Sequence, residues 1–88
     1  MFAVIEGSAI KYPIDMGFEE IGSFALPSSP SYHAGYLIAS DGIGFHGIAQ
    51  HGAHIEGPTE LVASGYAPFE THGSSCEGVR SELIAHFK

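Results

Sequence analysis

The sequence predicts an α+β fold in which a small antiparallel sheet of three to five strands carries a C-terminal helix packed on one face. Two hairpin signals and one strong helical pattern lead to this prediction. A chain of 88 residues has room for one hydrophobic core. We therefore expect residues 1–88 to form a single compact domain.

The first hairpin signal lies near the start of the chain. Residues 2–6 (FAVIE) and 9–14 (AIKYPI) are largely apolar and contain β-branched side chains. The Gly7-Ser8 step between them permits the positive φ that a tight turn requires. Pro13 has no N–H group for a sheet hydrogen bond, so the second strand should end there or lie at an edge.

The next segment predicts a short helix followed by a loop. Asp15 is a suitable N-cap for the helix. The apolar residues that would share one face of it are Phe18, Ile21, Ala25 and Leu26. Gly17 and Gly22 oppose this helix, each by about 1 kcal/mol relative to Ala. Residues 27–31 (PSSPS) predict the loop.

The second hairpin signal is the Asp41-Gly42 pair between two apolar runs. Residues 35–40 (GYLIAS) have the clearest strand pattern of the chain. Residues 43–48 (IGFHGI) are the expected partner, because Asp-Gly is well suited to a tight turn between two strands.

Residues 58–64 are compatible with two structures. Pro58 at a first helical position favours a short helix, whereas the β-branched Thr59 and Val62 favour a strand. The similarity of residues 61–64 (LVAS) to residues 37–40 (LIAS) inclines the interpretation toward a strand.

The C-terminal segment predicts a helix over residues 75–87. Ser74 and Glu77 match the S-x-x-E capping box. The apolar side chains that recur at helical spacing, with Ile84 beside them, are Cys76, Val79, Leu83 and Phe87. This apolar stripe should pack on the sheet.

Charge limits the possible functions. Three basic residues against ten acidic ones give a net charge of −7, which argues against nucleic acid as a direct ligand because phosphate binding needs a basic surface. We expect a non-enzymatic protein that docks on, and inhibits, a partner with a basic surface. An inhibitor from a phage or mobile element, acting on a host complex that handles nucleic acid, fits this size and charge. The side chains expected to bind the partner are Tyr32, Tyr36, Phe45, His46, Tyr66 and Phe69.

Composition also bears on association and location. Only 15% of the residues are charged, while the chain holds six Phe and four Tyr, so a homo-oligomer is expected. A small-ligand pocket between protomers is an alternative function. No apolar run is long enough to span a membrane, and the first residues lack the basic region of a signal peptide. These observations favour the cytoplasm and no membrane partner.

The favoured function needs no cofactor, but a histidine cluster supplies a second alternative function, with zinc or another divalent transition metal as cofactor. His46, His51 and His54 lie close together in the sequence, and imidazole is a common ligand of such metals. On a strand, His46 and His54 would share a face and His51 would not. No HExxH or CxxC spacing is present, so polar surface histidines in a glycine-rich ribbon are the competing interpretation.

Two further motifs are weaker. Cys76 would lie at a helix N-terminus, where the dipole favours a thiolate, and His72 could serve as its base. A buried cysteine in an apolar stripe is the commoner arrangement, so we expect no catalytic residue. Residues 42–47 match G-x-G-x-x-G, but a hairpin lacks the parallel βαβ unit of a dinucleotide site.

Overall fold

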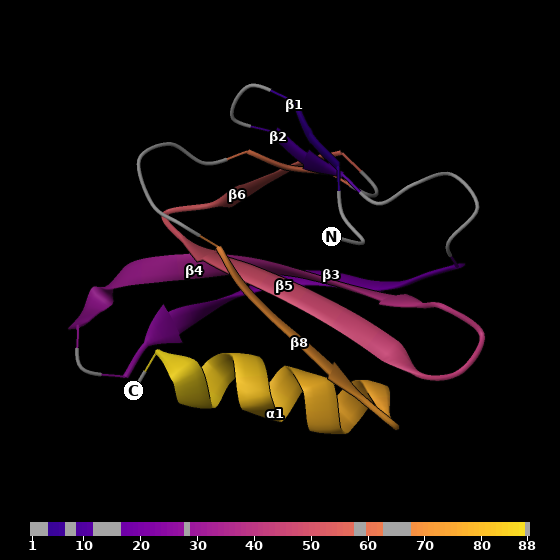
Figure 1. The fold of residues 1–88 in the computed structure, drawn as a ribbon. Helices are drawn as coiled ribbons and strands as arrows, with labels where there is room; N and C mark the ends of the chain where they lie inside the picture. The colour runs from indigo at the N-terminus through magenta and orange to yellow at the C-terminus, as the bar shows by residue number, and fades with distance from the viewer. Residues whose placement is uncertain are drawn as a thin grey trace.

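The chain is arranged in three layers, with a four-stranded sheet between a smaller sheet and a helix (Figure 1). The structure is a computed structural model that describes residues 4–6, 9–11, 17–27, 29–57, 60–62 and 68–87. The predicted α+β fold, with an antiparallel sheet and a C-terminal helix on one of its faces, is confirmed. The second sheet, on the opposite face, was not predicted.

The central sheet is entirely antiparallel and has the order β3-β4-β5-β8. Its strands are β3 (Gly17–Leu26), β4 (Ser29–Ser40), β5 (Phe45–His51) and β8 (Phe69–Gly73). Ser40 pairs with Phe45, so the predicted hairpin around Asp41-Gly42 is confirmed. The second strand of this hairpin begins at Phe45 rather than at residue 43, because residues 41–44 form the connecting loop.

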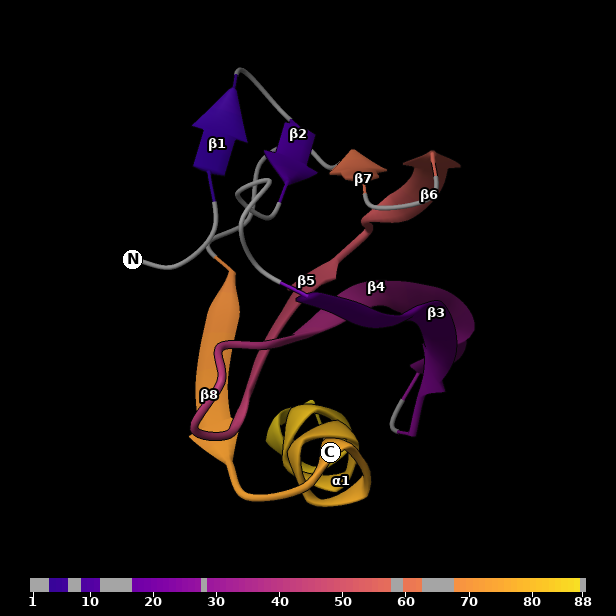
Figure 2. The same ribbon diagram turned by 90° about the vertical axis from the view of Figure 1, so that its right-hand side faces the viewer.

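The smaller sheet has the order β1-β2-β7-β6. Its strands are β1 (Val4–Glu6), β2 (Ala9–Lys11), β6 (His54–Gly57) and β7 (Glu60–Val62). The predicted N-terminal hairpin is confirmed, since β1 and β2 are antiparallel; Pro13 lies outside the described residues. Within residues 58–64, the described part is the strand β7. Figure 2 shows β5 leading upward into β6, and Gly52 provides a positive φ of 80° at this bend.

The predicted helix after Asp15 is wrong, because residues 17–26 form the strand β3. Its apolar side chains serve opposite faces of the sheet: Ile21 packs between the sheets, whereas Phe24 packs on the helix side. The side chains of this segment therefore alternate between the two faces of the sheet, and the segment pairs with β4 along its length in place of forming the helix that its apolar spacing also allows. Asp15 itself lies outside the described residues.

The predicted loop over residues 27–31 is also only partly correct. Pro27 lies in a turn, but β4 already begins at Ser29 and includes Pro30. The ladder between β3 and β4 shifts register here, because Leu26 pairs with Ser29 and Ala25 with His33. Proline, which has no N–H group, is tolerated at such an irregularity of the ladder.

The C-terminal helix α1 spans Cys76–His86 and confirms the predicted element. Its N-cap is Ser75 rather than Ser74: the Ser75 hydroxyl oxygen accepts a hydrogen bond from the Gly78 N–H group at 3.0 Å. Among the described residues, no helix is long and apolar enough to cross a membrane.

The hydrophobic core has one part on each face of the central sheet. The buried residues between the two sheets are Leu37, Ala39, Ile48, Ala53 and Leu61. Those between the central sheet and α1 are Tyr36, Ile38, Ala49, Val79 and Leu83, with Cys76 and Phe87 packed beside them. The predicted apolar stripe of the helix is thus confirmed as core.

Candidate metal centre

The loop between β4 and β5 holds the carboxylate of Asp41 in a fixed orientation. Asp41 Oδ1 accepts hydrogen bonds from the N–H groups of Ile43 at 3.0 Å and Gly44 at 2.9 Å. The Asp41 N–H group donates to the Gly44 carbonyl at 3.1 Å, and Gly42 adopts the positive φ of 91° that closes the loop. These backbone hydrogen bonds, chiefly that from Ile43, lower the pKa of Asp41, so the carboxylate is ionised at neutral pH.

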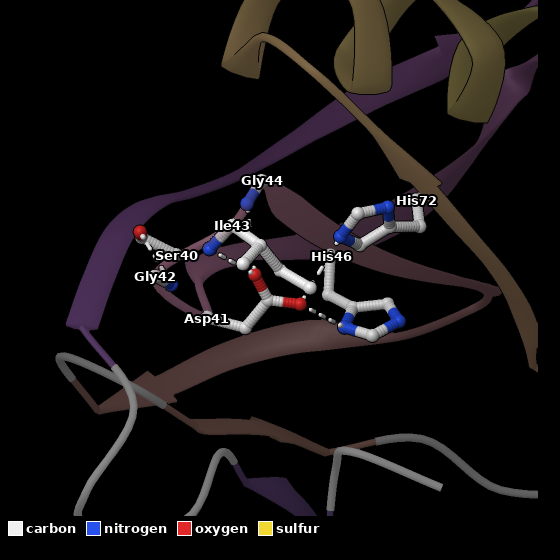
Figure 3. A network of polar contacts seen from close by, with 7 residues as sticks. All are labelled: Ser40, Asp41, Gly42, Ile43, Gly44, His46 and His72. Carbon is white, nitrogen blue, oxygen red and sulfur yellow. Dashed lines mark hydrogen bonds and ion pairs between the residues drawn. The ribbon is translucent and has the colours of Figure 1, made fainter.

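The other carboxylate oxygen faces two imidazoles that come from neighbouring strands (Figure 3). His46 on β5 and His72 on β8 are register partners, and their rings are 4.6 Å apart in a T-shaped arrangement. Asp41 Oδ2 lies 3.1 Å from His72 Nε2 and 3.5 Å from His46 Nδ1. One ligand atom from each of the three residues lies within 4.8 Å of those of the other two.

Gly44 allows this close approach. A Cβ atom at this position would lie 2.7 Å from His72 Cε1, 2.9 Å from His72 Nε2 and 2.7 Å from the Gly73 carbonyl oxygen. Carbon atoms in contact are normally about 3.5–4.0 Å apart, so a side chain here would displace the imidazole. The glycine is therefore required by the packing of His72 against the loop.

Asp41 and His46 have the protonation states that metal binding needs. Burial, the largest cause, lowers the pKa of His46, so the His46 imidazole is neutral at pH 7. A neutral imidazole has a lone pair for a metal, and an ionised carboxylate supplies a negative ligand. In a tetrahedral site with ligand bonds of about 2.0–2.1 Å, ligand atoms are about 3.3 Å apart. The two N–O separations, 3.1 and 3.5 Å, bracket that value.

The structure brings together a different set of residues from the three histidines singled out in the sequence. His46 belongs to the cluster, whereas His51 and His54 are not among its ligand groups. His51 is five residues along the same strand, so its side chain points to the opposite face, and its ring lies 5.9 Å from that of Tyr32. His54 lies in the other sheet and contacts Glu56, with an Nε2–Oε1 distance of 2.7 Å.

Asp41 and His72 were missed as ligands. The Asp41-Gly42 pair was interpreted only as a turn, and it is one, but the same side chain also faces the imidazoles. His72 lies 31 positions after Asp41, and only the pairing of β5 with β8 places it opposite His46. Residues 69–73 form the strand β8. The histidine within this short segment was the sequence signal that could have indicated His72 as a ligand.

The six residues expected to bind a protein partner are distributed over several environments. Tyr32 is exposed, and His46 belongs to the cluster described above. Tyr36 is buried in the core cluster beneath α1, and Phe45 and Phe69 are partly buried against that cluster. Tyr66 lies outside the described residues.

Cys76 belongs to a separate polar network around Glu20. The Arg80 guanidinium donates to both Glu20 carboxylate oxygens, Nε to Oε2 at 2.7 Å and Nη2 to Oε1 at 2.8 Å, and the Tyr36 hydroxyl donates to the same carboxylate. The Cys76 sulfur lies 3.9 Å from Glu20 Oε1. Burial and this carboxylate raise the pKa of Cys76, so it is a thiol at neutral pH and a poor nucleophile. The network ties α1 to β3 and β4.

Comparison of the chain with protein-family models, with curated protein sequences and with solved structures found no match. The features of the chain that bear on function are therefore the cluster of Asp41, His46 and His72 and the exposed surface. Of these, the cluster has the more specific geometry.

Proposed function

We propose that this protein binds a divalent transition-metal ion through Asp41, His46 and His72. The observation that supports the proposal is the convergence of two imidazoles on a carboxylate oxygen at 3.1 and 3.5 Å. Two nitrogen ligands favour zinc, cobalt, nickel, copper or iron, whereas calcium and magnesium prefer oxygen ligands. The backbone hydrogen bonds to Asp41 Oδ1 orient the carboxylate in the way that outer-shell contacts orient metal ligands.

A zinc titration followed by thermal unfolding tests this proposal. Zinc present at 100 times its dissociation constant stabilises a folded protein by about 2.7 kcal/mol, which raises the Tm of a domain of this size by roughly 10–20 °C. His72→Gln should abolish that shift. His54→Gln is the matched control, because His54 is exposed and lies outside the cluster.

The same comparison separates the two possible histidine sets. Loss of zinc binding in His72→Gln but not in His54→Gln supports the cluster on the central sheet. The opposite result would restore the set of His46, His51 and His54, and an unchanged Tm in the unsubstituted protein would contradict both sets.

The second candidate function is docking on a partner with a basic surface, with inhibition of that partner as the consequence. The net charge of −7 favours a basic partner. The side chain of Ile43 is 90% exposed at the tip of the β4–β5 loop, an unusual position for a large apolar residue, and Tyr32 is a second exposed anchor. The same apolar groups are available for self-association into a homo-oligomer.

Two measurements test this second candidate. Static light scattering should give a mass above the 9.3 kDa of one chain at micromolar concentration, and a monomer would contradict self-association. Capture of partners from a host lysate should weaken as salt is raised and should fail with Ile43→Ser. Glu77→Gln is the control, because Glu77 is an exposed charged residue distant in the sequence from Ile43. Equal capture of partners by all variants would exclude Ile43 as an anchor.

A further inference from the structure

The proposed metal centre is incomplete on its own. Zinc and related ions bind four or more ligands, and sites with three protein ligands keep the remaining position for water or another molecule. Among the described residues, the cluster contains three ligand groups. The centre therefore needs at least one donor from elsewhere.

The cluster is accessible to such a donor. The side chains of Asp41, His46 and His72 are 21%, 29% and 40% exposed, respectively. All three lie at one end of the central sheet, and Figure 3 shows their side chains facing one another. Ile43, which projects from this loop, is apolar and offers no ligand atom.

Glu70 is the neighbouring carboxylate to consider as a fourth ligand of the centre. It lies two residues before His72 on β8 and therefore on the same face, and its charge acts on His46. It is exposed, and its carboxylate is not part of the cluster of ligand atoms. Among the described residues, no further His, Cys, Asp or Glu supplies a ligand atom, so the fourth coordination position has no protein ligand from this part of the chain.

Charge indicates what kind of molecule occupies that position. A divalent ion contributes two positive charges and Asp41 one negative charge, so the centre with two neutral imidazoles has a net charge of +1. A small anionic oxygen or nitrogen donor neutralises this charge, and a carboxylate is the most common biological group of that kind. We propose that the metal, once bound, keeps an exchangeable position that binds a small anion such as a carboxylate. This inference rests on the metal-binding function proposed above.

Cobalt-substituted protein provides the test, because the visible absorption of Co²⁺ depends on its ligands. The protein is first titrated with Co²⁺ alone, and then with azide and separately with acetate. We expect Co²⁺ bands that saturate at one equivalent, and a further saturable change of the spectrum with each anion. Glu70→Gln should bind Co²⁺ within about twofold of the unsubstituted protein and should respond to both anions.

The outcomes distinguish the two proposals. If Co²⁺ produces no saturable bands, or the same bands in His72→Gln, the metal-binding function is wrong. If Co²⁺ binds but neither anion changes the spectrum, the exchangeable position is wrong while metal binding stands. If Glu70→Gln weakens Co²⁺ binding tenfold or more, Glu70 closes the centre as a fourth ligand, and the inference is overturned in favour of a closed structural site.

Discussion

Gly47 lies where helix α1 packs directly on the backbone of β5, and Gly47→Ala should destabilise the protein. A Cβ atom at this position would overlap Val79 Cγ1 and lie 2.9 Å from Leu83 Cδ1. Both helix residues are fully buried, so neither side chain has free space to move into. The substitution therefore requires α1 to shift away from the sheet.

The expected magnitude follows from two opposing effects. Over-packing a filled core costs about 1–3 kcal/mol, and overlap with a fully buried methyl group argues for the upper half of that range. Replacing glycine by alanine in a strand returns about 0.5–1 kcal/mol. The net loss of unfolding free energy should be about 1–2.5 kcal/mol, or roughly 4–20 °C in Tm.

A double-mutant cycle with Val79→Ala checks the cause. Val79→Ala alone removes two buried methyl groups and should cost about 2–3 kcal/mol. It also removes the atom that the new Cβ would meet, so the double variant should be more stable than the sum of the single effects by about 1–2 kcal/mol. Urea denaturation of the four proteins measures this difference. Effects that add to within about 0.5 kcal/mol would refute direct packing of the helix on Gly47.

Three further predictions concern the polar groups. Burial, and then the hydrogen bond to Glu20, raise the pKa of Tyr36 to about 12 from its ordinary value of 10.0, so the contribution of Tyr36 to stability is complete below pH 10 and is lost as the pH rises toward 12. Urea denaturation should show a smaller alkaline loss of stability in Tyr36→Phe, whereas exposed Tyr32→Phe should match the unsubstituted protein. Ser75→Ala should lower the unfolding free energy by about 1 kcal/mol and Ser74→Ala by less than about 0.5 kcal/mol, since Ser75 is the N-cap; the reverse order would contradict the assigned cap. Gly44→Ala should weaken zinc binding by about tenfold or more in a calorimetric titration, because its Cβ would displace the ligand imidazole packed on the loop; unchanged affinity would exclude that imidazole as a ligand.

The sequence alone predicted the elements whose signals are local. The turn at Asp41-Gly42 lies directly between the strands that it joins, and the helical stripe over residues 76–87 repeats within one segment. The strand β3 was mistaken for a helix because Ile21 and Leu26 also fit a helical face, and only pairing with β4 decides between the two periods.

The β1–β2 hairpin of the smaller sheet was predicted, but the pairing of this hairpin with β7 and β6 could not be. The strand β7 is three residues long, too short for a clear alternation of apolar and polar residues. The pairing of Ala9 with Val62 joins distant parts of the sequence. Such pairing is decided by burial of Leu61 against the central sheet, which is a property of the assembled layers.

In the candidate site, too, the sequence determines the local features and the tertiary structure determines which of them meet. The sequence by itself determined a histidine-containing hairpin, an aspartate at its turn and an acidic surface, since these depend only on residue types and short spacings. The tertiary structure decided which groups meet: the register of β5 with β8 places His72 opposite His46, and the fold of the β4–β5 loop turns Asp41 toward both. A shift of one residue in that register would reverse the side-chain faces, because successive residues of a strand point to opposite sides of the sheet. Packing on the two faces of the central sheet selects the register, and no short stretch of sequence contains that information.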